Sequence, residues 1–316
     1  MDGDNSNGNR QGGAQEAASR ASLAARQAGV GSPQTGIDSA QMNVARRRSP
    51  WPLAVVAALF IILPFLSWYS TTFWRELDDE EIEKYLNDDQ KPRHVQHALE
   101  EIDRRIVKGD QSVRRWYPQV LRVAGNPLPD IRMAAAWMMG DDNKSVEFHA
   151  ALKQLVRDED PAVRRMAALS LSRFNDADAR AELLAMLRPY SLRPQFGRTV
   201  ITTLPSGSAV SRGALVARVR DEKNLIHEVR APVAGKIERA SAVDGAFQHT
   251  GEELLVLAPD GKNVWEALRA LSLVGTAEDL PDIERYARGE VGGMSEEIKQ
   301  LAALTAEIIR SRAVGK

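Results

Sequence analysis

Residues 207–223 read GSAVSRGALVARVRDEK, residues 228–237 read EVRAPVAGKI, and a closing stretch at residues 250–257 reads TGEELLVL. In each part, glycines alternate with runs of β-branched and aliphatic residues. Glycine permits the positive φ of tight turns, and Pro232 fixes φ at the end of a strand. Alternating Val, Leu and Ile side chains face one core. We therefore expect a small flattened β-barrel over residues 197–260, with structural turns at Gly207, Gly213, Pro232, Gly235, Gly245 and Gly251.

These motifs resemble the biotinyl/lipoyl carrier domains and the barrel-sandwich domain of bacterial membrane-fusion proteins. The resemblance covers roughly a fifth of the chain. It rests on the Gly207/Val210/Gly213 turn, the Val216/Val219 strand, the turn at residues 231–235 and the closing strand from Gly251. Membrane-fusion proteins typically carry a helical hairpin between the two halves, whereas residues 223–227 leave room only for a tight turn. The resemblance thus implies an interaction module of barrel-sandwich type rather than a tripartite efflux adaptor.

The same resemblance places Lys223 where carrier domains present the lysine that receives biotin or lipoate. Biotinyl domains have a methionine on each side of that lysine, and lipoyl domains usually have an aspartate before it and an alanine after it. Here the neighbours are Glu222 and Asn224. A solvated hairpin tip is the simplest interpretation, because charged residues belong at such a tip. Attachment of biotin or lipoate at Lys223 is the alternative.

An apolar segment precedes this region. Between Arg48 and Arg75 the chain has no charged residue, and residues 51–69 read WPLAVVAALFIILPFLSWY. A membrane helix needs about 20 mostly apolar residues. We therefore predict a transmembrane helix over residues 49–74, with membrane lipid as its partner. A cleaved signal peptide and a buried core helix are the alternatives, but a leader of about fifty residues is long for a signal peptide.

Charge on either side of this segment indicates its orientation. Arg46, Arg47 and Arg48 precede it, and the acidic run at residues 78–81 follows it. The positive-inside rule then keeps the N-terminus in the cytoplasm. The prediction is a single-pass protein of the bacterial inner membrane with a cytoplasmic tail at residues 1–48, an acidic juxtamembrane segment at residues 75–92 and a periplasmic folded part. The tail has few aliphatic residues and no aromatic residue, a composition typical of disorder.

A second motif recurs outside the β-rich region. Residues 129–137 read PDIRMAAAW, residues 161–169 read PAVRRMAAL, and a weaker copy at residues 297–304 reads EIKQLAAL. The spacing and the helical pattern resemble the HEAT and HEAT-like repeats, which predicts helical repeats over residues 93–190 and further HEAT-like helices over residues 263–313. The shared positions are Ile131, Arg132, Ala135, Ala136, Val163, Arg164, Ala167, Ala168, Ile298, Lys299, Ala302 and Ala303.

These shared positions suggest packing rather than catalysis. Alanine pairs let neighbouring helices approach closely, while the aliphatic residues and Trp137 are expected to fill the seam between helices. The leading Asp-Pro or Pro-Asp is expected to cap the helix. Arg132, Arg164 and Lys299 can pair with acidic turn residues and form a ladder that keeps the repeats in register. Ligand binding by these basic residues is the alternative.

The composition and the absence of known catalytic motifs argue against several classes of function. The net charge of −1 gives no indication of nucleic-acid binding, and the absence of cysteine excludes disulfides, thiol catalysis and zinc–cysteine sites. No nucleophile elbow, phosphate loop or recognisable metal triad occurs in the sequence. We therefore expect no catalytic residue, no metal and no cofactor.

Together these patterns predict a multi-domain α plus β protein: one transmembrane helix, a HEAT-like α-solenoid and an all-β barrel-sandwich domain inserted in it. The expected function is a membrane-anchored, non-enzymatic scaffold that binds protein partners at the solenoid and barrel surfaces, as an accessory of a transport or secretion assembly at the cell envelope. The alternative is a cytoplasm-facing biotinyl/lipoyl carrier protein that uses Lys223.

Overall fold

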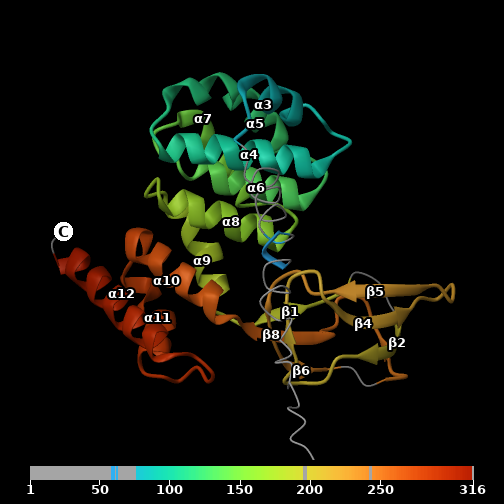
Figure 1. Ribbon diagram of the computed structural model, residues 1–316. Coiled ribbons are helices and arrows are strands. Elements are labelled where there is room, and N and C mark those ends of the chain that lie inside the picture. The colour runs from blue at the N-terminus through green and yellow to red at the C-terminus, as the bar shows by residue number, and fades with distance from the viewer. Residues whose placement is uncertain (1–57, 61, 63–75, 195–197, 242–243, 315–316) are drawn as a thin grey trace, which may run out of the picture. The chain divides into compact units, whose positions relative to one another are not determined.

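The structure is a computed structural model that describes residues 58–60, 62, 76–194, 198–241 and 244–314. The chain divides into two compact units, residues 1–71 and 72–316. Nearly all of the described residues belong to the second unit, which contains both helices and strands (Figure 1).

Helices occupy the described chain on both sides of a strand-rich segment. The first section contains α3 Asp79–Leu86, α4 Pro92–Val107, η1 Gln111–Trp116, α5 Tyr117–Val123, α6 Pro129–Met139, α7 Val146–Leu155, α8 Pro161–Ser172, η2 Ala177–Ala179 and α9 Arg180–Met186. The second section contains α10 Gly261–Val274, η3 Ala277–Asp279, α11 Leu280–Ala287 and α12 Glu296–Val314.

The two helical sections form one stack. Helices α4, α6, α8, α10 and α12 each contact the next, and α10 packs on both α8 and α9 although the strand-rich segment separates them in the sequence. Figure 1 shows α4, α6 and α8 lying side by side in that order. One hydrophobic core runs through both sections, from Leu77 to Ile309. The strand-rich segment therefore emerges between two repeats without interrupting their packing.

Small residues permit the close approach of neighbouring helices in this stack. Ala135, Ala136, Ala167 and Ala168 are fully buried. A Cβ added at Gly140 would lie 2.7 Å from the Ser170 hydroxyl, which itself donates to the carbonyl of Ala136 at 2.7 Å. The alanine positions thus do what the repeat pattern predicts, because a larger side chain would hold the helices apart.

The predicted N-terminal capping by the Pro-Asp and Asp-Pro motifs is found in α8 but not in α6. Asp160 caps α8 and accepts hydrogen bonds from the backbone N–H groups of Ala162 and Val163. In α6 the N-cap position is Leu128, which makes no side-chain capping bond, and Asp130 lies in the first turn. A proline at the start of the helix, whose φ already suits a helix, is common to both.

The strand-rich segment, residues 190–259, is called here the β-domain. Its strands are β1 Tyr190–Leu192, β2 Arg198–Thr203, β3 Ala209–Val210, β4 Leu215–Arg220, β5 Ile226–Arg230, β6 Gly235–Ala240, β7 Phe247–Gln248 and β8 Leu255–Pro259. They form two four-stranded antiparallel sheets with the orders β1-β8-β6-β3 and β5-β4-β2-β7. Two small cores lie in the β-domain, one around Val216, Ile237 and Leu257 and the other around Val200, Val219 and Leu254.

The prediction of a closed flattened barrel is wrong. Each sheet ends in edge strands, β1 and β3 in one and β5 and β7 in the other. Within the described parts of the β-domain, strands β3 and β7 have two residues each and pair on one side only, so the hydrogen-bonded ladder does not continue around a barrel. The sequence pattern identified the turns and the strand-rich character, but alternating residues are equally compatible with two open sheets.

The predicted fold class also included a transmembrane helix, and here too it is corrected. Among the described residues, no helix is both long and apolar enough to span a membrane. The 19-residue helix α12 has the length but carries charged side chains from Glu296 to Arg312. The predicted span at residues 49–74 lies outside the described residues except for 58–60 and 62, as does the predicted tail at residues 1–48. The described chain is a mixed structure of helices and open sheets.

Candidate functional site

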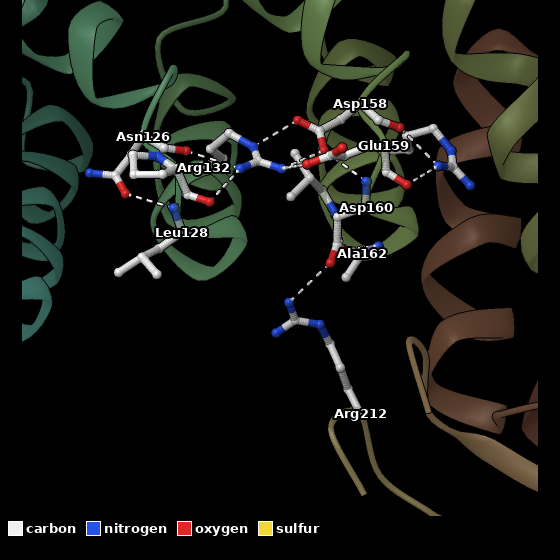
Figure 2. A network of polar contacts seen from close by, with 11 residues as sticks. Asn126, Leu128, Arg132, Asp158, Glu159, Asp160, Ala162 and Arg212 are labelled. Atoms are coloured by element: carbon white, nitrogen blue, oxygen red, sulfur yellow. Dashed lines mark hydrogen bonds and ion pairs between the residues drawn. The ribbon is translucent and has the colours of Figure 1, made fainter. Parts of the chain in front are cut away.

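A polar network lies at the N-terminal ends of α6 and α8, built around Arg132 (Figure 2). The Arg132 guanidinium binds Asp158 with two hydrogen bonds, Nε to Oδ2 at 2.8 Å and Nη2 to Oδ1 at 2.7 Å. Its Nη1 donates to the carbonyl oxygens of Asn126 and Pro127 at 2.9 and 3.1 Å. Burial alone would raise the pKa of Asp158, but hydrogen bonds from Arg132 and from the Asp160 N–H lower it below its ordinary value. Arg132 is therefore a charged, buried cross-link between two successive repeats.

Arg164 repeats this arrangement one repeat later. Its Nε donates to Glu182 Oε2 at 3.1 Å, and its Nη1 donates to the carbonyl oxygens of Asp158 and Glu159 at 2.8 and 3.1 Å. The two carbonyl groups lie six and five residues before the arginine, as they do for Arg132. The predicted ladder is thus present at these two positions. In each step the arginine bonds to carbonyl groups of the loop before its own helix and to a carboxylate in the next loop or helix.

A third step of the ladder joins the helices before the β-domain to the helices after it, and the sequence pattern did not predict it. Arg180 binds Asp279 with two hydrogen bonds of 2.9 Å and also donates to the Thr276 hydroxyl at 2.6 Å. Burial would raise the pKa of Asp279, but the bonds from Arg180 and Thr276 lower it. Tyr286 adds a hydroxyl bond of 2.6 Å to the carbonyl oxygen of Leu187. These contacts join α9 to η3 and α11 across a separation of 99 residues.

The weak third copy of the repeat motif does not supply a ladder step. Lys299 is paired at 3.1 Å with Glu296 in its own helix, on the exposed surface. Ile298 and Ala302 are buried, but Ala303 is exposed. Helix α12 instead buries Ala302, Thr305 and Ala306, and the Thr305 hydroxyl donates to the carbonyl oxygen of Leu268 at 3.2 Å. This bond links α12 to α10 as Ser170 links α8 to α6.

Arg212 connects the β-domain to the ladder. It lies in the turn between β3 and β4 and bonds to Asp130 in the first turn of α6. Its Nη2 also lies 3.7 Å from Asp160 Oδ2 at the N-cap of α8, a contact visible in Figure 2. Both carboxylates belong to the Pro-Asp and Asp-Pro motifs of the repeats, so one arginine of the β-domain contacts two successive repeats.

Lys223 lies at the exposed tip of the hairpin that joins β4 and β5. The Asp221 carboxylate shapes this tip by accepting hydrogen bonds from the backbone N–H groups of Lys223 and Leu225, both at 2.9 Å. Leu225 and Ile226 beside it are more than half exposed. The tip is thus accessible, as the solvated-hairpin interpretation and the carrier alternative both require.

The turn residues fall into two groups. Gly207, Gly213, Gly245 and Gly251 adopt positive φ values between 79° and 91°. Gly235 is needed for another reason, because an added Cβ would lie 2.5 Å from the carbonyl oxygen of Ala258 on the adjacent strand. Pro232 lies in the turn that precedes β6.

A groove lined by residues of α6, α8 and α10 contains two exposed tryptophans, and we call it the tryptophan groove. Trp137 is 44% exposed, which corrects the expectation that it fills the seam, and Trp265 is 40% exposed. Each ring is covered by an arginine, Arg173 at 5.4 Å from the Trp137 centroid and Arg269 at 4.7 Å from the Trp265 centroid. The groove is lined by Trp137, Leu169, Ser172, Arg173, Trp265, Glu266, Arg269, Ala270, Ser272 and Leu273.

One titratable group beside Trp137 has a strongly shifted pKa. Burial and the neighbouring Asp141 carboxyl raise the pKa of Asp103 to about 7, against the opposing effects of Arg173 and Trp137. Asp141 in turn forms an ion pair with Arg173. Asp103 is therefore held close to a second carboxyl group, next to Trp137 and Arg173.

The described residues show no group of three or more His, Cys, Asp or Glu side chains placed to hold a metal ion. Three of the five histidines each contact a different carboxylate instead. His94 contacts Asp88 at 2.8 Å, His149 contacts Asp176 at 2.6 Å and His227 contacts Asp221 at 2.8 Å, each in a different part of the fold.

Comparison with known proteins identifies part of the chain. No curated protein matched it. Among solved structures, it is similar to a chain titled "Structure and function of a single-chain, multi-domain long-chain acyl-CoA carboxylase", with 23% identity and a TM-score of 0.22. The match covers 33% of this chain and 10% of that one, and at this level it carries no argument about function. No comparison confirms the resemblance of residues 197–260 to biotinyl or lipoyl domains. Residues 118–193 match the family model described as HEAT repeats, so this part of the helical region is HEAT-like, as the repeated motif predicted.

Proposed function

We propose that this protein is a non-enzymatic scaffold in which HEAT-like repeats bind a protein partner and hold the β-domain at a fixed place between two repeats. HEAT repeats are extended arrays that offer binding surfaces, which supports an interaction role. The observation that carries the proposal is the continuity of the stack across the β-domain, with α10 packed on α8 and Arg180 bonded to Asp279.

Continuity matters because an insertion that broke the stack would leave two independently moving helical blocks. Here a partly buried arginine–aspartate pair and the Tyr286 hydroxyl join the chain before the β-domain to the chain after it. Arg212 adds a contact from the β-domain to α6 and α8. A rigid array of this kind gives a partner and the β-domain a defined geometry, which is what a scaffold supplies.

Co-purification tests the interaction role. The full chain, tagged at its C-terminus, is isolated from its native cells, and each retained protein is purified and mixed with it again. We expect at least one protein to bind directly and with defined stoichiometry. A matched control is the Lys299→Ala variant, whose only change is an exposed pair on α12. The absence of any direct binder from the purified mixtures would contradict the proposal.

A carrier function at Lys223 is a second candidate, favoured by the exposed position of this lysine at the hairpin tip. The intact mass of the protein from its native cells distinguishes the two. A mass equal to that of the unmodified chain supports the scaffold. An added biotinyl or lipoyl group that disappears in the Lys223→Arg variant supports the carrier.

A further inference from the structure

The tryptophan groove contains large aromatic side chains that the fold leaves partly exposed. Trp116 shows how this chain buries an indole, with 2% exposure in the core. Trp137 and Trp265 are 44% and 40% exposed on α6 and α10. Leu169, at the repeat position equivalent to Trp137, lies on α8 and also lines the groove. Three helices of the stack therefore contribute apolar surface to one groove.

Two arginines, Arg173 and Arg269, and one glutamate, Glu266, line this groove, so cationic side chains outnumber anionic ones in its lining. Arg173 and Arg269 each cover one tryptophan ring, and Arg312 bonds to the carbonyl oxygens of Ser272 and Leu273 at one end of the groove. Arg173 and Arg312 have structural roles, because Arg173 pairs with Asp141 and Arg312 satisfies carbonyl groups at the C-terminal end of α10.

Arg269 is exposed in the middle of α10, where its guanidinium lies over the Trp265 ring one turn earlier in the same helix. A guanidinium stacked on an indole keeps its N–H donors pointing to the side, where they can bind a carboxylate with two parallel hydrogen bonds. Arg269 can therefore pair with a carboxylate while the adjacent Trp265 ring contacts an apolar group.

We infer that the tryptophan groove binds an extended segment of a protein partner in which acidic side chains are spaced by apolar ones. The apolar side chains contact the faces and edges of Trp137, Leu169 and Trp265. The carboxylates pair with Arg269 and with the outer donors of Arg173. This inference rests on the scaffold function proposed above and names the surface and the partner chemistry that it uses.

Fluorescence anisotropy with three labelled peptides tests the inference on the full chain. The peptides are identical in length and have leucines spaced by glutamates, by lysines or by serines. We expect the glutamate peptide to bind about tenfold or more tightly than the other two, with an affinity that falls as salt is added. Equal binding of all three peptides, or preference for the lysine peptide, would overturn the inference.

Two groove variants locate the binding. Trp265→Ala and Arg269→Glu are each expected to weaken binding of the glutamate peptide by roughly tenfold or more, the loss typical of a central aromatic or arginine contact. Leu304→Ala and Arg220→Glu change exposed residues outside the groove and serve as matched controls. Binding that survives both groove variants, while their thermal unfolding matches that of the wild type, would contradict the inference.

Two further readouts separate this inference from its alternatives. If sedimentation shows a dimer that Trp265→Ala dissociates, the occupant is a second copy of the chain and the acidic-peptide inference fails. If a reconstituted partner binds wild type and Arg269→Glu equally, the groove inference fails while the scaffold function stands. A partner that loses binding to Arg269→Glu but not to Arg220→Glu supports both.

Discussion

The helical repeats and the β-domain bury apolar side chains in different ways. The repeats share one core that extends from α3 to α12, so each helix supports its neighbours. The β-domain has two small cores, and several of its chain reversals depend on glycines with positive φ. A repeat array gains stability by adding neighbours to a common core, whereas a small sheet domain depends on a few side chains and on local backbone geometry.

The largest effects should come from removing core side chains in each region. Phe148 is fully buried in α7, with its ring centroid 4.1 Å from that of Tyr117, and Leu255 is fully buried in β8. We expect Phe148→Ala to destabilise the helical stack by about 3–5 kcal/mol and Leu255→Ala to cost about 2–5 kcal/mol. Hydrogen exchange measures where protection is lost.

The comparison predicts different extents of unfolding for these two variants. Phe148→Ala should lower protection throughout α5 to α9, while Leu255→Ala should lower it mainly within residues 190–259. Loss of protection in α6 and α8 caused by Leu255→Ala would show that the two regions unfold as one unit.

The next largest effect should come from a buried step of the ladder. Arg132→Ala leaves the Asp158 carboxylate buried without its bidentate partner, and we expect a loss of about 3 kcal/mol. Lys299→Ala removes an exposed pair at the corresponding motif position and should cost less than about 0.5 kcal/mol. Urea unfolding measures both. Equal losses would mean that the buried ladder adds nothing beyond a surface ion pair.

Glycine substitutions distinguish two causes of strain within the β-domain. Gly213→Val places a β-branched residue at a φ of +80° in open space, which should cost about 1–2 kcal/mol. Gly235→Val forces a side chain against the Ala258 backbone, so the pairing of β6 with β8 must shift and the cost should be about 2–3 kcal/mol. Limited proteolysis of both variants reports the result. Wild-type resistance in either variant would contradict the cause assigned to that glycine.

A pH-dependent effect belongs to the helical stack. The pKa of Asp103 is about 7 in the folded chain and its ordinary value is 3.8, so the folded state binds more protons between these values. Stability contributed by this group is therefore fully present below about pH 4 and falls as pH rises to about 7. Asp103→Asn should raise the free energy of unfolding at pH 8 by roughly 1–2 kcal/mol, a value reduced by partial solvation, and should change it little near pH 4.

Urea unfolding of wild type and Asp103→Asn at several pH values measures this effect. Asp141, Arg173 and Trp137 face Asp103, and all three remain in the variant. Identical pH dependence of the two proteins would show that Asp103 is ionised in the fold at neutral pH.

Much of the helical stack could be predicted from the sequence, because a period of about 32 residues places Arg132 and Arg164 at equivalent sites and alanines at each helix contact. The third ladder step could not, since Arg180 and Asp279 share no motif and meet only because the β-domain leaves the stack intact. The exposure of Trp137 was also missed, because a helical pattern does not show where the neighbouring helix ends. In the β-domain, alternation indicated strands but did not distinguish two open sheets from a closed barrel.

The smallest effect should come from the contact that joins the two regions. Arg212 pairs with Asp130 and lies near Asp160, and its side chain is 30% exposed, so Arg212→Ala should cost less than about 1 kcal/mol of global stability. Its effect should instead be on motion between the regions, because this arginine touches two repeats at once. The chain has no native cysteine, so spin labels can be attached after the substitutions Ala150→Cys on α7 and Lys236→Cys on β6. We expect a narrow distribution of label distances in the wild type and a broader one with Arg212→Ala. An unchanged distribution would mean that the stack alone positions the β-domain, through the two chain connections at α9 and α10, and that the fixed geometry of the scaffold does not need the Arg212 contact.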